Sequence, residues 1–288
     1  MKISGLTKRS SKEGLFTLAD TMNPPADHSL NFSSNMNTET KVDKLVTRIY
    51  PSRKEMGIAA AEAVGKTIAG LLLRQEEVNI IFAAAPSQNE FLESLCGYTH
   101  LDWKRVNAFH MDEYIGLQKN SPMKFGYFLK NKIFDRLPFR AIHYIDGYST
   151  GIEKECTRYA NLLLKNPADI ICMGIGENNH IAFNDPHVAE FEDRLLVKIV
   201  ELDERSRLQQ VRDGCFAKIQ DVPSGAITLT IPALMKARFI YCVVPGKNKA
   251  IAVYNTLKKD IEERFPSTIL RNHENAIMFL DQDSGTLL

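Results

Sequence analysis

The chain has little cysteine, and its few cysteines follow no functional pattern. Its 288 residues include five cysteines, at positions 96, 156, 172, 215 and 242. None lie in the CxxC spacing of zinc or redox sites, and Cys172 and Cys242 fall inside apolar runs. An odd, scattered set of thiols excludes a disulfide framework and is typical of a reduced compartment. We therefore expect a cytoplasmic protein with mostly buried, free thiols.

The sequence also lacks an excess of charge and any long apolar run. Lysine and arginine number 36 against 35 acidic residues, which gives a net charge of +1. Without a basic field we expect neither a nucleic-acid partner nor a membrane surface. No apolar segment approaches the roughly 18 residues of a membrane span. No apolar run follows Lys2, Lys8 and Arg9, so we expect no secretory signal.

The patterns that are present predict an α/β fold. Hydrophobic residues make up 44% of the chain, enough for a full core. From residue 42 onward, short apolar strands alternate with amphipathic helices. Strands are expected at 45–50, 78–84, 106–110, 143–145, 170–173, 195–201, 226–230, 239–244 and 276–280. Helices are expected at 53–74, 89–95, 122–134, 151–164, 203–212 and 249–257. This order predicts one Rossmann-like domain over 44–288, a mainly parallel sheet with helices on both faces.

Residues 1–43 differ in composition from the rest. They are rich in serine, asparagine, threonine and lysine, include Pro24-Pro25, and show no sustained period. We interpret them as a flexible or surface-draped extension. The alternative is an arm that packs on the partner subunit of a homo-oligomer, suggested by Leu15, Phe16 and Leu18.

The most informative stretch is 169–186. The apolar run 170–173 predicts a buried strand, and Gly174 and Gly176 then allow a sharp turn or a close approach. A cluster of acids, amides and one histidine follows, at positions 177, 178, 179, 180, 184 and 185. Such a cluster after a strand is how α/β sheets present chemistry at their carboxyl edge.

His180 is the candidate acid–base group of this stretch. Asn178 and Asp185 are close enough in sequence to orient its imidazole and set its tautomer. The alternative is a structural histidine. Metal binding is not favoured, because no second histidine or cysteine lies at ligand spacing.

Asp112 follows the predicted strand 106–110 and is a candidate base. A carboxylate shielded from water at this edge has a raised pKa and accepts protons near neutral pH. The alternative, on the residues alone, is that Asp112 caps the next turn while Glu113 is solvated.

Four further residues are candidates for binding an anion. Ser87 begins a helix after a strand, although an ordinary N-cap is the favoured interpretation of a lone serine there. Lys249 follows Gly246 at a strand-to-helix turn, a place that suits a phosphate-binding or an exposed lysine. Arg207 and Arg212 lie about 140° apart around a helix, so both need not face one ligand.

Several of these segments resemble one family. The stretch 174–186 resembles the Gly-x-Gly-x-Asp-Gly-His-Ile-Ala-Phe-Asn-Glu-Pro signature of the glucosamine-6-phosphate deaminase (isomerase) family. Residues 109–117 resemble its Asn-Met-Asp-Glu-Tyr-Val-Gly-Leu segment. Residues 202–212 are similar to its Leu-x-x-x-Thr-Arg-x-x-x-x-Arg segment, and 245–250 to its Gly-x-x-Lys-Ala turn. The order agrees over about 45–288.

The resemblance implies an activity and roles for the candidate residues. The enzyme would open the ring of a 2-amino-2-deoxyhexose 6-phosphate, move a proton from C2 and release ammonia, without a metal or organic cofactor. Asp112 would be the base at C2, and His180, oriented by Asp185, would assist ring opening. Ser87, Arg212 and Lys249 would hold the phosphate, with Arg207 nearby. Gly176 and Asn178 belong to the same signature.

The chain departs from the family pattern at the site itself. Asn178 stands where the family has an acid, and Asn179 where it has a glycine. The segment 84–88, Ala-Ala-Pro-Ser-Gln, lacks the glycines of the family's phosphate loop. Galactosamine 6-phosphate is an alternative substrate. A catalytically weakened sugar-phosphate binding or regulatory protein and a 6-phosphogluconolactonase-type hydrolase are the competing functions.

Overall fold

An eight-stranded sheet forms the centre of the protein, which a computed structural model describes over residues 38–288. Its order is β1-β2-β11-β10-β7-β3-β4-β6. The strands are β1 Thr38–Val42, β2 Leu45–Tyr50, β11 Ala276–Asp281, β10 Phe239–Val244, β7 Ile170–Met173, β3 Val78–Phe82, β4 Val106–His110 and β6 Ala141–His143. Neighbours from β2 onward are parallel, and β1 pairs antiparallel with β2. The predicted mainly parallel sheet is confirmed.

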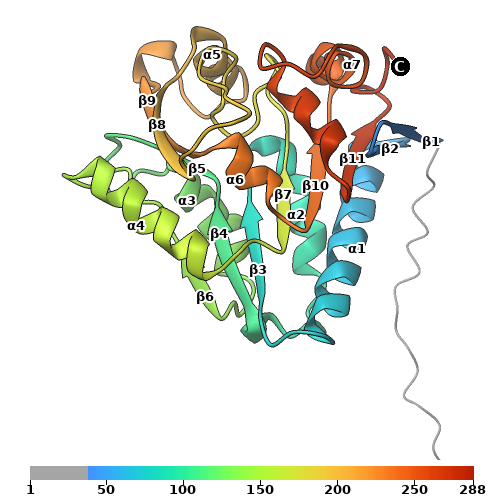
Figure 1. The fold of residues 1–288 in the computed structure, drawn as a ribbon, viewed down its shortest axis with the longest axis horizontal. Coiled ribbons are helices and arrows are strands. Elements are labelled where there is room, and N and C mark those ends of the chain that lie inside the picture. Colours follow the sequence, from blue (N-terminus) through green and yellow to red (C-terminus); the bar gives the residue numbers. More distant parts are fainter. Residues whose placement is uncertain (1–37) are drawn as a thin grey trace, which may run out of the picture. The chain divides into compact units, whose positions relative to one another are not determined.

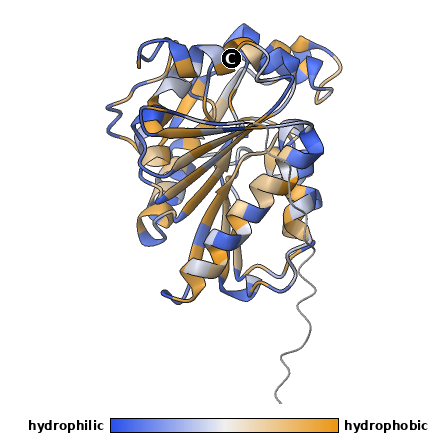
Figure 2. Cartoon of the chain, turned by 90° about the vertical axis from the view of Figure 1, so that its right-hand side faces the viewer, coloured by the Kyte–Doolittle hydropathy of each residue, from blue (hydrophilic) through white to orange (hydrophobic). Residues whose placement is uncertain are grey.

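Helices cover both faces of this sheet. The alternation along β3 directs Ile80 and Phe82 into one core and Ile81 into the other. The first core includes residues of α1 (Arg53–Leu72), α2 (Asn89–Cys96) and α3 (Phe125–Leu129). The second includes residues of α4 (Ile152–Lys165), α6 (Ile231–Met235) and α7 (Ala250–Lys258). Figure 2 shows mostly hydrophobic strands in the interior and helices of mixed hydrophilic and hydrophobic residues around them.

A second, smaller sheet was not predicted. It consists of β5 (Asp112–Tyr114), β9 (Gly225–Leu229) and β8 (Val197–Glu201), antiparallel in the order β5-β9-β8. Two of its strands were expected, but as members of one parallel sheet. The chain leaves the large sheet at Met111, between β4 and β5. Asp112 therefore belongs to the small sheet while following directly on a strand of the large one.

Other boundaries also differ from expectation. Strand β1 begins at Thr38, so residues 38–42 belong to the sheet rather than to the extension predicted over 1–43. The rest of that extension, including the arm alternative, lies outside the described residues. The helix predicted over 122–134 begins at Phe125 and continues from Lys130 to Phe134 as a π-helix.

Two helices stand above the carboxyl ends of the parallel strands, as Figure 1 shows: α5 (Glu204–Arg212) and α7. Helix α5 begins at Asp203, whose carboxylate accepts a hydrogen bond from the Ser206 N–H at 3.1 Å. An aspartate in this position satisfies an otherwise unpaired backbone donor and favours the helix start.

The structure bears on two further expectations from the sequence, those about the cysteines and about membrane-spanning helices. All five cysteines are free and four of them are buried. No helix within residues 38–288 has the length and apolar character needed to cross a bilayer.

Candidate active site

A pocket at the carboxyl edge of the large sheet gathers five of the nine predicted site residues. Ser87, Asp112, Gly176, His180 and Lys249 all line it. They follow β3, β4, β7 and β10, which bring their carboxyl ends to one edge. The other four, Asn178, Asp185, Arg207 and Arg212, do not line the pocket.

The loop after β7 holds His180 against Gly176. The Gly176 N–H donates to the His180 carbonyl at 2.8 Å. A Cβ on Gly176 would lie 2.3 Å from ring atoms of His180. The close approach expected at this glycine is thus an approach to the imidazole.

Asn179 gives the loop its shape. Its φ is 68°, a conformation that asparagine tolerates and that glycine adopts freely. Its buried side-chain amide donates to the Ala252 carbonyl at 2.7 Å and to Ser267 Oγ at 2.9 Å. The asparagine therefore keeps a glycine-like turn and ties it to α7 and to the 3₁₀ segment Pro266–Asn272.

The His180 ring is held from one side by Asp185 and Ser206. Its Nδ1 lies 3.0 Å from Asp185 Oδ1 and 2.9 Å from Ser206 Oγ. The Ser206 hydroxyl itself donates to Asp185. Since the carboxylate only accepts, Nδ1 carries a proton, and in the neutral ring Nε2 is the accepting nitrogen. The expected orientation of His180 by Asp185 is present in this geometry.

The Asp185 carboxyl is fully buried and charged. Its side chain has 0% exposure. Burial acts to raise the pKa of Asp185, but the hydrogen bonds from His180 and its neighbours outweigh it and hold the pKa well below its ordinary value. A permanent negative charge beside Nδ1 stabilises a positively charged imidazole.

Asn178 acts on the loop rather than on the ring. Its Oδ1 accepts from the His180 backbone N–H at 3.2 Å. Its Nδ2 donates to Asp185 Oδ1 at 3.0 Å, with Ser206 Oγ at 3.3 Å and Asp203 Oδ2 at 3.4 Å. The Asn178 amide thus lies among three oxygen acceptors, and two of them, on Asp203 and Ser206, were not expected from the sequence to be near it.

Asp112 lines the pocket, and the residue is 6% exposed. Among residues 38–288, no side chain or backbone group donates a hydrogen bond to its carboxylate, and no cation pairs with it. Burial, and then the neighbouring Glu113 carboxyl, raise the pKa of Asp112 well above its ordinary 3.8. The alternative interpretation of Asp112 as a turn cap is wrong. A buried carboxylate without a partner is suited to take a proton from a substrate.

Glu113 is buried, not solvated. Its carboxylate accepts from the backbone N–H groups of Tyr114, Phe125 and Gly126, each at 3.0 Å. Burial raises the pKa of Glu113 to about 7, against the effect of these donors. Glu113 therefore anchors the start of α3, whose Phe125 also lines the pocket.

His110 holds the backbone of Asp112 and was not predicted as a site residue. Its Nδ1 donates to the Asp112 carbonyl at 2.9 Å, and its Nε2 accepts from the Ile145 N–H at 2.9 Å. Burial lowers the pKa of His110 to about 4, so the ring is neutral at pH 7. No sequence signal distinguished it from a core histidine.

Ser87 does not cap a helix, contrary to the favoured interpretation. The 3₁₀ turn Pro86–Gln88 and α2 have no side-chain cap. Ser87 Oγ accepts from Gln88 Nε2 at 3.1 Å, which leaves its own O–H able to donate to a ligand. Gln88 also donates to the Val243 carbonyl at 3.1 Å.

Lys249 is a buried cation at the pocket wall. It is 4% exposed, and its ammonium has no carboxylate partner among residues 38–288. Burial lowers the pKa of Lys249 below its ordinary 10.5. Because an unpaired buried charge is costly, a bound anion would stabilise this ammonium. The alternative of an exposed lysine is wrong.

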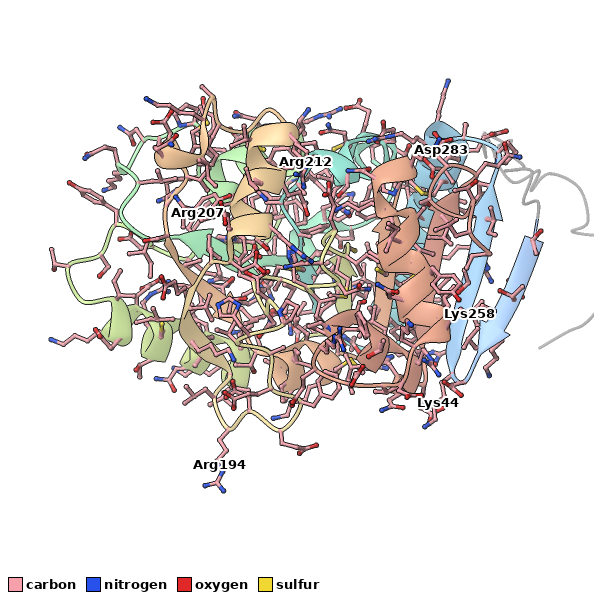
Figure 3. All side chains as sticks on the ribbon, turned by 90° about the horizontal axis from the view of Figure 1, so that it is seen from above. Lys44, Arg194, Arg207, Arg212, Lys258 and Asp283 are labelled. Carbon is pink, nitrogen blue, oxygen red and sulfur yellow. The ribbon has the colours of Figure 1, made fainter. Side chains whose placement is uncertain are left out.

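The two arginines of α5 have different partners, as their spacing suggested. Arg207 donates to the backbone carbonyls of Ile219 and Val222 at 2.9 and 3.0 Å, outside the pocket. Arg212 forms an ion pair with Glu177 and is about half exposed. Figure 3 shows the two side chains at separate positions on α5. The structure does not bring Arg207 to the predicted phosphate site.

Known proteins are similar to this chain in sequence and in fold. The sequence model of the family described as glucosamine-6-phosphate isomerases/6-phosphogluconolactonase matches residues 51–279. A glucosamine-6-phosphate deaminase of Bacillus cytotoxicus is 40% identical over 187 residues, 65% of this chain and 70% of the relative. One of Bacillus cereus strain B4264 is 38% identical over the same shares.

Solved structures extend the similarity to most of the described fold. A monomeric glucosamine-6-phosphate deaminase superposes with a TM-score of 0.77 at 25% identity, covering 84% of this chain and 99% of that one. A 6-phosphogluconolactonase of Thermotoga maritima gives 0.68 at 19% identity, covering 83% and 100%. At that identity the lactonase shows the shared fold alone.

Proposed function

The chain belongs to the family of glucosamine-6-phosphate isomerases and 6-phosphogluconolactonases, and from this we propose that it is a glucosamine-6-phosphate deaminase. The reaction is an aldose–ketose isomerisation with deamination. Glucosamine 6-phosphate and water give fructose 6-phosphate and ammonia. One observation carries the proposal: the Asp112 carboxylate and the Lys249 ammonium, both without an ionic partner among the described residues, line the same pocket as the oriented His180 imidazole.

Ring opening is the proposed task of His180. The ring carries its proton on Nδ1, facing Asp185 and Ser206, so Nε2 is free to exchange a proton with the sugar. The sugar must lose a proton at O1 and gain one at O5 when its ring opens. An imidazole supported by a buried carboxylate carries out such transfers near neutral pH.

Proton transfer at C2 is the proposed task of Asp112. Its carboxylate removes the C2 proton and returns it to C1, while O1 gains a proton and the amino nitrogen loses one. Together these transfers convert the open-chain 2-amino aldose into a 2-imino ketose. Water then adds to C2, and the C2–N bond breaks to release ammonia. The raised pKa of Asp112 makes it a stronger base than an exposed aspartate.

Binding of the phosphate is the proposed task of Lys249 and Ser87. The ammonium offsets the dianion, and the hydroxyl donates a hydrogen bond. Arg212 lies at the rim in an ion pair with Glu177, and it reaches the phosphate only if that pair opens. His180 and Asp112 can carry out the proton transfers, and Lys249 can offset the charge of the phosphate. We therefore propose that no metal or organic cofactor takes part.

The proposal is tested by ammonia release from glucosamine 6-phosphate and from its galacto epimer. Turnover of either sugar, lost in Asp112→Asn and kept in Asp102→Asn at an exposed position, supports it. Measurable binding of both sugars without turnover would instead establish a sugar-phosphate binding protein. Hydrolysis of 6-phosphogluconolactone without ammonia release would establish the lactonase.

The proposal also covers the cellular location and the oligomeric state. Five free thiols favour a cytoplasmic location. Self-association remains a prediction, which light scattering of the full chain decides.

A further inference from the structure

The side-chain amide of Asn178 lies between two carboxylates. Its Nδ2 is 3.0 Å from Asp185 Oδ1 and 3.4 Å from Asp203 Oδ2. The two acids also meet directly, since the Asp203 backbone N–H donates to Asp185 Oδ2 at 3.1 Å. An amide NH₂ is the donor that lets both carboxylates remain so close.

Asp203 is connected to the His180 ring through Ser206. Its Oδ1 accepts the Ser206 backbone N–H at 3.1 Å, which fixes the first turn of α5. The Ser206 hydroxyl is buried and lies 2.9 Å from His180 Nδ1. Asp203 thus holds the serine that binds the imidazole, and also faces the amide that holds the His180 backbone.

An acid at position 178 would conflict with this arrangement. A carboxylate in place of the amide would put three acceptors, on residues 178, 185 and 203, within hydrogen-bond distance and without a proton to share. Like charges at such separations repel, and the repulsion is screened least at the fully buried Asp185, whereas positions 178 and 203 are partly buried. Asp112 and Lys249 line the pocket beside His180, and Arg212 pairs with Glu177; within residues 38–288 none of these four donates a hydrogen bond to this cluster.

We propose that Asp203 is a positioning residue for the His180–Asp185 pair, and that Asn178 is an amide because residue 203 is an acid. Carboxyl and amide are then exchangeable between the two positions, although neither is replaceable alone. The proposal deepens the proposed function, on which its turnover measurements rest. The contacts themselves concern the folded protein without substrate.

The test is a double-mutant cycle of Asn178→Asp, Asp203→Asn and both together. Asparagine also caps helices, so Asp203→Asn keeps α5. We expect Asn178→Asp to lower kcat about tenfold or more with little change in KM, and the double variant to recover most of that loss. Asn120→Asp and Asp102→Asn, both at exposed positions, are the charge controls and should leave kcat unchanged.

Two measurements are independent of turnover. The ¹⁵N NMR spectrum of the His180 ring should report a proton on Nδ1 in the wild type and the double variant, and a changed spectrum in Asn178→Asp. The melting temperature should fall by several degrees in Asn178→Asp and recover in the double variant.

Additive losses in the cycle, or an Asn178→Asp variant as active and stable as the wild type, would overturn the proposal. A double variant that fails to fold would do the same. If the wild type turns over neither sugar, the proposed function fails, while the NMR and melting measurements still decide the role of Asp203.

Discussion

The imidazole of His180 rests directly on Gly176, with ring atoms 2.3 Å from the place a Cβ would occupy. Gly176→Ala must therefore displace the ring and lengthen its contact with Asp185. We expect kcat to fall by about 10²-fold, because small misplacements of catalytic groups carry such costs. Steady-state kinetics and ligand binding check this. Gly70→Ala, where a Cβ meets nothing within 4 Å, should retain full activity.

Removing the carboxylate of Asp112 should abolish proton transfer but not binding. In Asp112→Asn we expect exchange of the C2 hydrogen with solvent to fall by about 10²–10⁴-fold, the usual contribution of a general base. Affinity for the sugar phosphate should change little. Isotope exchange followed by NMR measures the first and calorimetry the second. Exchange at the wild-type rate would rule out Asp112 as the base.

The same variant should change how stability depends on pH. The folded-state pKa of Asp112 is raised, so its neutral form contributes stability that is fully present below the ordinary 3.8 and is lost as pH rises through the raised value. Asp112→Asn keeps a neutral side chain at every pH. Its melting temperature relative to wild type should therefore increase as pH rises from 4 to 8. A constant difference, as expected for Asp102→Asn, would contradict the shift.

Lys249 offers a matched pair with Lys247 on the same 3₁₀ turn. Lys249 is buried at the pocket, whereas Lys247 is exposed. Lys249→Met should raise KM by about 10–100-fold, because a hydrogen bond to a charged group contributes roughly 1.5–3 kcal/mol. Lys247→Met should leave KM unchanged. Equal effects of the two substitutions on KM would contradict the proposal that Lys249 binds the phosphate.

Arg207 should matter for stability and not for the substrate. Its guanidinium binds two backbone carbonyls in the segment 219–222. Arg207→Ala leaves those carbonyls without a donor, and we expect a loss of about 1–3 kcal/mol in unfolding free energy with KM retained. Chemical denaturation and kinetics separate the two effects. A raised KM at unchanged stability would instead indicate that Arg207 contributes to phosphate binding.

The sequence predicted the elements that carry strong local patterns. The bounds of β2, β4 and β10 agree with the predicted strands because each is an apolar segment ended by a clear break. The rule that parallel strands present polar groups at their carboxyl ends was enough to bring Asp112, His180 and Lys249 to one pocket.

The remaining features depend on contacts between distant segments. Ser206 reaches His180 from 26 residues away, and Gln88 reaches Val243 across 155. The pairing of β5 with β9 likewise joins segments more than a hundred residues apart. No local period encodes such partners. The sequence could not predict the proposed role of Asn178 for the same reason, because that role depends on the distant residue Asp203.

The separation of the two sheets has a consequence for which substrates fit. Asp112 stands on the small antiparallel sheet, whereas Ser87 and Lys249 follow strands of the large parallel one. Asp112 also follows β4 of the large sheet with one residue between them, so the two sheets together fix the span from the proposed base to the proposed phosphate-binding residues. A sugar phosphate one carbon shorter or longer would present the wrong carbon to Asp112. On the proposed roles of these residues, the fold would select its substrate by length before any contact with an individual hydroxyl group.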